Sequence, residues 1–180
     1  MFELGTASSV SDLFSKINTF AGTAGLTVDH SASDRSFYTR SGVSVAFRWA
    51  TSSAVNVGVY QHTAFINSST DPGSHTNDSG QGAISGVDAT IAASRSVALV
   101  NGSMNYWLFE DDNYLHVVAE TAPGQFRHFG FGMLVKSGTW TGGAYSYGWR
   151  NANVGTSDLG ITENVSILLD GLAGSATPTT

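Results

Sequence analysis

The sequence predicts a mainly β protein of the α+β class, an antiparallel sheet or β-sandwich with one N-terminal amphipathic helix. Charged residues make up only 12% of the 180 residues and glycine accounts for 21 of them, so hydroxyls and amides replace much of the usual surface charge. One early segment has helical periodicity, and most later segments have strand patterns separated by turn residues. We expect a single β-rich domain over residues 1–172 and a flexible C-terminal tail over 173–180.

The helix is predicted within the stretch SVSDLFSKINTFAGTAGLTVDH. Ser9 suits the N-cap position, and Asp12 three residues later completes an arrangement like a capping box. Apolar residues then recur at three- and four-residue steps and form one stripe: Val10, Leu13, Phe14, Ile17 and Phe20. Gly22 or Gly25 is expected to end the helix, because glycine adopts the left-handed conformation at low cost. A strand should begin near Leu26.

Strand patterns follow the helix. SFYTR and VSVAFRWA flank Ser41-Gly42, which predicts a hairpin with a two-residue turn. AVNVGVYQHTAFI alternates around Gly58, where we expect a bulge or a close contact. Residues 67–86 contain almost no apolar side chain, which predicts an exposed functional loop or a mobile one. VDATIAASRSVALV fits either a short helix or a strand, and NVSILLDG fits a last apolar strand.

Two further hairpins are predicted between Asn105 and Ser137. Three consecutive acids, Glu110 to Asp112, invite a metal or acid–base interpretation. A hard cation, however, needs oxygens that converge from spaced positions, and consecutive strand residues point to alternate faces. Asp112-Asn113 is a favoured turn dipeptide between two aromatic-rich runs. The acids are therefore predicted to form a turn.

Pro123-Gly124 is expected to join the strands of the second hairpin. Simple pairing across this turn places Glu120 opposite Arg127, where they would form a cross-strand ion pair. The same register keeps the imidazoles of His116 and His128 apart. No HExxH or HxH spacing is present, so no zinc site is predicted.

Gly130 and Gly132 alternate with aromatic residues in a strand pattern and lack the spacing of a phosphate-binding loop. Glycines on one face of a strand leave room for a bulky neighbour. We expect that neighbour to be Trp107 or a residue of another chain.

The segment GTWTGGAYSYGWRN contains the candidate binding residues, which are Trp140, Tyr145, Tyr147 and Trp149. In strand geometry the last three share one face. They form either a core layer of the sheet or an aromatic surface that contacts a protein or stacks on sugars. The second interpretation predicts binding and not catalysis.

Composition argues against several classes of function. The net charge is −6 and the eight Lys and Arg residues are scattered, which predicts no direct nucleic-acid binding. The absence of cysteine removes disulfides and thiolate chemistry. The N-terminal residues lack the pattern of a signal peptide, and no apolar run approaches the ~20 residues of a membrane-spanning helix, so no membrane insertion is expected.

Catalytic motifs are also missing from the sequence. No GxSxG elbow occurs, and no Ser-His-Asp trio follows from spacing. Glycoside cleavage uses two carboxyl groups that meet in a cleft, and nothing in the sequence selects such a pair. We therefore predict no catalytic residue, no metal and no cofactor.

Several motifs resemble a group of tailed-bacteriophage virion proteins described as structural or tail proteins. Their pattern has a short Gly-Thr opening, a helix like LLDKLxxFxxxxGW, an aromatic YWFF run, and an apolar strand that turns into YLGF. The corresponding places here are occupied by Gly5-Thr6, Leu13 to Phe20, Tyr106 to Phe109 and His128 to Gly132. The similarity covers both ends of the chain and is thin across the middle.

The resemblance implies a structural component of a tailed-phage virion, in the tail, neck or baseplate region, assembled in the host cytoplasm. Its partners would be copies of itself and other virion proteins, and it would not be an enzyme. A capsid decoration protein is one alternative. A carbohydrate- or receptor-binding module with a glycan as partner is another, and a glycan hydrolase is a third hypothesis.

Overall fold

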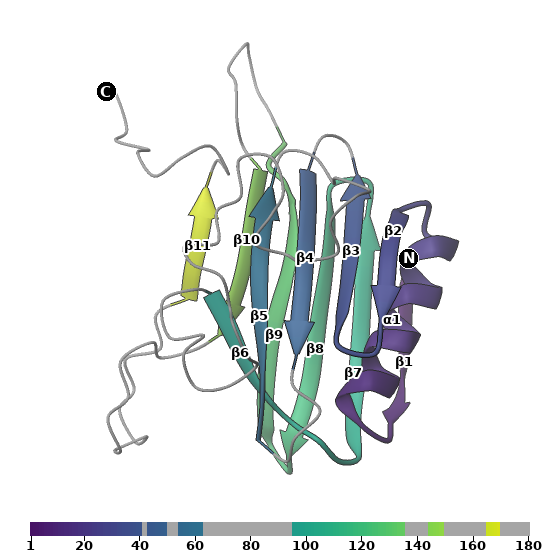
Figure 1. Cartoon of the computed structure of the whole chain (residues 1–180), viewed down its shortest axis with the longest axis vertical. Coiled ribbons are helices and arrows are strands. Elements are labelled where there is room, and N and C mark those ends of the chain that lie inside the picture. Colours follow the sequence, from purple (N-terminus) through teal and green to yellow (C-terminus); the bar gives the residue numbers. More distant parts are fainter. Residues whose placement is uncertain (41–42, 50–53, 63–94, 136–143, 150–164, 170–180) are drawn as a thin grey trace.

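The described residues fold into two antiparallel β-sheets and one helix (Figure 1). The computed structural model describes residues 1–40, 43–49, 54–62, 95–135, 144–149 and 165–169. Over these residues one sheet has six strands in the order β1-β7-β8-β9-β10-β11, and the other has five in the order β2-β3-β4-β5-β6. This arrangement confirms the predicted mainly β fold with one N-terminal helix.

Along the described part of the chain, successive strands change from one sheet to the other twice. The first strand, β1, belongs to the six-stranded sheet, the next five strands build the other sheet, and the last five return. The six-stranded sheet consists of β1 (Phe2–Ala7), β7 (Met104–Asp111), β8 (Tyr114–Ala122), β9 (Gln125–Met133), β10 (Ala144–Trp149) and β11 (Val165–Leu169). The five-stranded sheet consists of β2 (Thr27–Ala32), β3 (Arg35–Arg40), β4 (Val43–Trp49), β5 (Ala54–His62) and β6 (Arg95–Val100).

The helix α1 (Val10–Thr23) forms as predicted. The Ser9 hydroxyl accepts a hydrogen bond from the backbone N–H of Asp12 at 3.1 Å, and the Asp12 carboxylate accepts one from the N–H of Ser8 at 2.9 Å. The first bond satisfies a free N–H group of the first turn, and the second fixes the residue that precedes the N-cap. Gly25 follows the helix with a φ of 83°, which confirms it as the left-handed residue.

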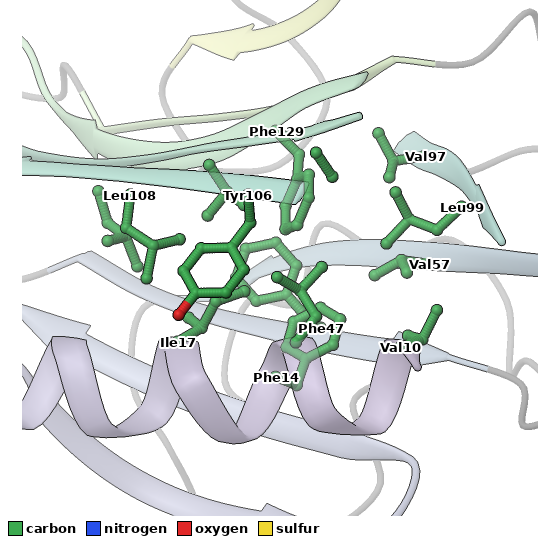
Figure 2. Packing of buried hydrophobic residues seen from close by; sticks show 14 of the residues in the cluster. Val10, Phe14, Ile17, Phe47, Val57, Val97, Leu99, Tyr106, Leu108 and Phe129 are labelled. Carbon is green, nitrogen blue, oxygen red and sulfur yellow. The ribbon is translucent and has the colours of Figure 1, made fainter. Parts of the chain in front are cut away.

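The core lies between the two sheets, and α1 packs against it with its predicted apolar stripe (Figure 2). Phe14 stacks on Trp49 with ring centroids 4.0 Å apart, and it also contacts Phe47 and Phe129. Phe129 comes from the six-stranded sheet and Phe47 from the five-stranded one, so these rings join all three layers. Burial of this apolar surface is the main source of stability.

The five-stranded sheet follows the predicted hairpins with one difference. Arg40 pairs with Val43, so β3 and β4 are joined by two residues, as expected. Gly58 pairs regularly with Arg48 on one side and Ser96 on the other, so the bulge, one of the two alternatives expected at Gly58, does not occur. Within the ambiguous segment VDATIAASRSVALV, residues Arg95–Val100 form the strand β6. Residues 67–86 and 173–180 lie outside the described residues.

The hairpin between β8 and β9 differs from simple pairing. Its turn contains Gly124 with a φ of 75°, and Ala122 faces Gln125 as expected. A bulge between Glu120 and Ala122 then shifts the register by one residue, so that Glu120 faces Phe126. The predicted pairing of Glu120 with Arg127 is therefore wrong. The Glu120 carboxylate instead accepts hydrogen bonds from Asn105 and from the Gly124 N–H.

Candidate functional site

The six-stranded sheet has one face in the core and one face outside it. Along β7 the side chains of Tyr106 and Leu108 lie in the core, and the residues between them point the other way. Cross-strand pairing extends this alternation over the sheet. We call the set that points away from the core the outer face; its side chains include Phe2, Leu4, Thr6, Asn105, Trp107, Phe109, Asp111, Tyr114, His116, Val118, Glu120, Phe126, His128, Tyr145 and Tyr147.

Large apolar side chains on the outer face remain open to solvent. Leu4 is 62% exposed, Phe2 54% and Phe126 42%. Phe2 contacts Phe109 with ring centroids 5.1 Å apart, and Trp107 contacts Phe126 at 5.8 Å. These rings connect β1, β7 and β9 into one apolar patch. Contiguous exposed apolar patches mark interaction surfaces in soluble proteins.

A row of aromatic rings occupies the other half of the outer face, over β8, β9 and β10. Tyr147 pairs with Gly130, and its hydroxyl reaches across that glycine to contact Nδ1 of His116. The His116 and Tyr147 rings are nearly parallel, with centroids 5.6 Å apart. Tyr145 stacks beside Tyr147 at 6.1 Å and lies over Gly132 in the same way.

The two histidines of the hairpin meet, contrary to the prediction. Nε2 of His116 lies 3.3 Å from Nδ1 of His128. The bulge before Ala122 places His116 opposite Gly130 and His128 opposite Val118, so the two imidazoles become diagonal neighbours. The error in the sequence prediction comes from this single inserted residue.

The contacts of His116 define a chain of hydrogen bonds. Every contact is satisfied when the Tyr147 hydroxyl donates to Nδ1 of His116 and the Nε2–H of His116 donates to His128. Burial lowers the pKa of His116 to about 4, and the neighbouring His128 adds to this effect. Burial also raises the pKa of the Tyr147 hydroxyl above its ordinary value. Both Tyr147 and His116 are therefore neutral at pH 7.

The candidate residues from GTWTGGAYSYGWRN divide into two groups. Tyr145 and Tyr147 are half-buried on the outer face, and not in the core layer. Trp140 and the side chain of Trp149 lie outside the described residues. The glycines do make room on a sheet face, as predicted, but for these tyrosines and not for Trp107.

Sequence reasoning missed the part of the outer face that β1 contributes. The sequence motifs there predict only a Gly-Thr opening before the helix. The alternation of Phe2, Leu4 and Thr6 with Glu3 and Gly5 was the available signal for a strand. Phe126 and Trp107 lie on the outer face because of the way in which the strands pair, which the sequence alone does not reveal.

The acidic run separates into two roles. Asp111 and Asp112 belong to the predicted turn, where the Asp111 carboxylate accepts hydrogen bonds from the N–H groups of Asn113 and Tyr114. The prediction that Glu110 belongs to the turn is wrong, because this residue is only 7% exposed and its carboxylate pairs with Arg40 of the other sheet. This ion pair joins β7 to β3.

The surroundings of this ion pair form a small pocket. Arg40 and Asp112 line it together with Leu26, Tyr114 and Met133, and it has room for about one water molecule. That space is too small for an organic substrate. Within the described residues, no group of three or more His, Cys, Asp or Glu side chains is placed to hold a metal ion. No helix in the described part of the chain is long and apolar enough to cross a membrane.

A scan against protein-family models and a search of curated proteins found no match to this chain. The resemblance to virion proteins therefore rests on the sequence motifs quoted for it.

Proposed function

We propose that this chain is a structural subunit of a tailed-bacteriophage virion, in the tail, neck or baseplate region. It assembles there with copies of itself and with other virion proteins through the outer face. The observation that carries the proposal is the exposure of Phe2, Leu4 and Phe126 on one sheet face. The proposal assigns the chain no catalytic activity, metal or cofactor.

The chemistry of the outer face fits a protein–protein contact. Interface centres are depleted in charge and enriched in aromatic residues. The outer face offers Trp107, Phe126 and the tyrosine row. Its carboxylates, Asp111 and Glu120, accept backbone N–H hydrogen bonds within their own hairpin turns.

Placement in a virion rests on the resemblance of the motifs and on composition. A low content of charged residues with abundant glycine suits a subunit present in many copies. Such a subunit assembles in the host cytoplasm and leaves by lysis, so it needs no export signal.

Quantitative mass spectrometry of purified phage particles tests this function. The account predicts tens of copies of the chain or more in each intact particle. Separate measurements on isolated tails and isolated capsids distinguish a tail, neck or baseplate subunit from a capsid decoration protein. Detection of the chain in the lysate but not in particles would overturn both.

A carbohydrate- or receptor-binding module is a second candidate, favoured by the nearly parallel rings of Tyr145 and Tyr147 on the outer face. Aromatic rings of this kind can stack on sugars. A glycan array probed with the wild-type chain and with Tyr145→Ala decides it. Binding that is lost in Tyr145→Ala supports this candidate, and absence of wild-type binding eliminates it.

A further inference from the structure

We infer that β1 pairs antiparallel with β1 of a second copy across a two-fold axis at Leu4, which joins two six-stranded sheets into one. The inference rests on the proposed function only in treating the chain as an assembling subunit. It adds the identity of the partner, the strand that binds it and the register of the contact.

The backbone N–H and C=O groups of successive β1 residues point to opposite sides of the strand. This strand ends the sheet order and pairs only with β7 among the described residues. The amino group of Met1 donates a hydrogen bond to the carbonyl of Glu110, and the N–H of Glu110 donates one to the carbonyl of Met1. Because hydrogen-bonded residues alternate in an antiparallel ladder, Glu3 and Gly5 also face β7.

Phe2, Leu4 and Thr6 consequently direct their N–H and C=O groups away from the sheet. Within the described part of the chain these groups have no hydrogen-bond partner. Proteins commonly protect such an edge with proline, lysine, a bulge or a charged side chain. The strand FELGTA contains neither proline nor lysine, and its pairing with β7 has no bulge. Its acid Glu3 is bonded to the Tyr106 hydroxyl at 2.8 Å.

The helix α1 lies at the end of the sandwich where β1 and β2 form the edges of the two sheets (Figure 1). The buried residues of α1 belong to the core between the two sheets. Both Phe2 and Leu4 are more than half exposed. The unpaired backbone groups of β1 can therefore bond a further strand beside it, in the same sheet as β7.

The strand β1 is also complementary to itself. A two-fold axis at Leu4 places Leu4 opposite Leu4 of the second copy, and Phe2 opposite its Thr6. Three residues on each strand then use every outward N–H and C=O, which makes six hydrogen bonds between the copies. An axis at Glu3 or at Gly5 leaves the groups of one outward residue unpaired on each strand.

The register at Leu4 also suits the side chains. It places Glu3 opposite Gly5 of the second copy, whereas an axis at Glu3 places the two Glu3 carboxylates opposite each other. The exposed Phe2 and Leu4 of both copies come together on one side of the combined sheet. The two outer faces then form one continuous apolar surface. These features favour a second copy over an unrelated peptide.

Disulfide trapping tests this register directly, because the chain has no cysteine of its own. In a hydrogen-bonded pair the Cα atoms are about 5.5 Å apart, within the ~4.4–6.8 Å range of disulfides. Leu4→Cys in the full chain should therefore give a covalent dimer under mild oxidation. Thr6→Cys is the matched control, since its two thiols would be roughly 14 Å apart along the strands.

On a non-reducing gel we expect at least tenfold more dimer from Leu4→Cys than from Thr6→Cys. Equal trapping of both variants, or none with either, overturns the inference. Because Leu4 is 62% exposed, these substitutions should leave the fold intact, which far-UV circular dichroism verifies.

Charge exchange at Leu4 provides an independent test. Leu4→Lys and Leu4→Glu should each be monomeric in analytical ultracentrifugation at concentrations where the wild type is dimeric. Mixing the two variants should restore a dimer, because position 4 faces itself. A Leu4→Lys variant that dimerises like the wild type contradicts the pairing.

The inference and the proposed function can fail separately. Trapping by Leu4→Cys with no chain in phage particles supports the pairing and refutes the virion role. Presence in particles without trapping refutes the pairing and leaves the virion role standing.

Discussion

The hydroxyl oxygen of Tyr147 lies 2.8 Å from the position that a Cβ atom would occupy at Gly130. The backbone oxygen of Leu115 is still closer to this position, at 2.2 Å. A side chain at residue 130 would therefore push against both the tyrosine and the neighbouring strand. The absence of a side chain at Gly130 is what lets Tyr147 reach His116.

Gly130→Ala should destabilise the protein by about 1–3 kcal/mol, as overpacking does elsewhere, because backbone atoms must move. Gly22→Ala is the matched control. Gly22 lies on α1, and a Cβ atom there would meet nothing within 4 Å. It should be neutral or stabilise by up to about 1 kcal/mol. Urea denaturation measures both, and equal effects of the two substitutions would contradict the packing described for Tyr147.

Removal of Arg40 from the ion pair between the sheets should lower the free energy of unfolding more than removal of its exposed partner, Asp112. Arg40→Ala leaves the buried Glu110 carboxylate with the amino group of Met1 at 3.5 Å as its remaining partner. We expect a loss of about 3 kcal/mol in the free energy of unfolding. Asp112 also contacts Arg40, but its side chain is 97% exposed, so Asp112→Asn should stay near the wild-type value. Similar losses in the two variants would refute a specific role for the buried pair.

Stability should fall as pH drops from about 6.5 to about 4 because of His116. The pKa of this histidine is lowered from 6.5 to about 4 in the folded chain. Within that window the unfolded chain binds more protons, so acid favours unfolding. The contribution of His116 is fully present above pH 6.5 and is lost progressively down to about pH 4.

Urea denaturation at pH steps from 7 to 4 checks the role of His116. His116→Gln should remove most of the pH dependence in this window. His128→Gln should keep most of it, because burial, and not the neighbouring imidazole, is the main cause of the shift. An unchanged pH profile in His116→Gln would show that this histidine does not titrate as described.

Local sequence signals were sufficient for much of the fold. The N-cap at Ser9, the apolar stripe of α1 and the turn dipeptides each depend on neighbours within a few residues, and each was predicted. Gly130 and Gly132 were also correctly assigned to make room on a sheet face. The tyrosines that fill this room come from β10. The sequence does not reveal that β10 pairs with β9.

The missed features depend on contacts that are distant in sequence or on one irregular residue. Arg40 and Glu110 are 70 residues apart and meet only because the two sheets pack face to face. The bulge before Ala122 has no local signature, yet it reverses the prediction for His116 and His128. The strand β1 is short, and its partner β7 begins about a hundred residues later.

Incorporation of outer-face variants into phage particles tests the central claim most directly. Phe126 is 42% exposed on the outer face, and Val135 is 80% exposed beyond the end of β9. Phe126→Ser should lower the number of copies per purified particle at least tenfold, whereas Val135→Ser should match the wild type, as counted by quantitative mass spectrometry. Equal incorporation of all three chains, or absence of the wild type from particles, would contradict assembly through this face.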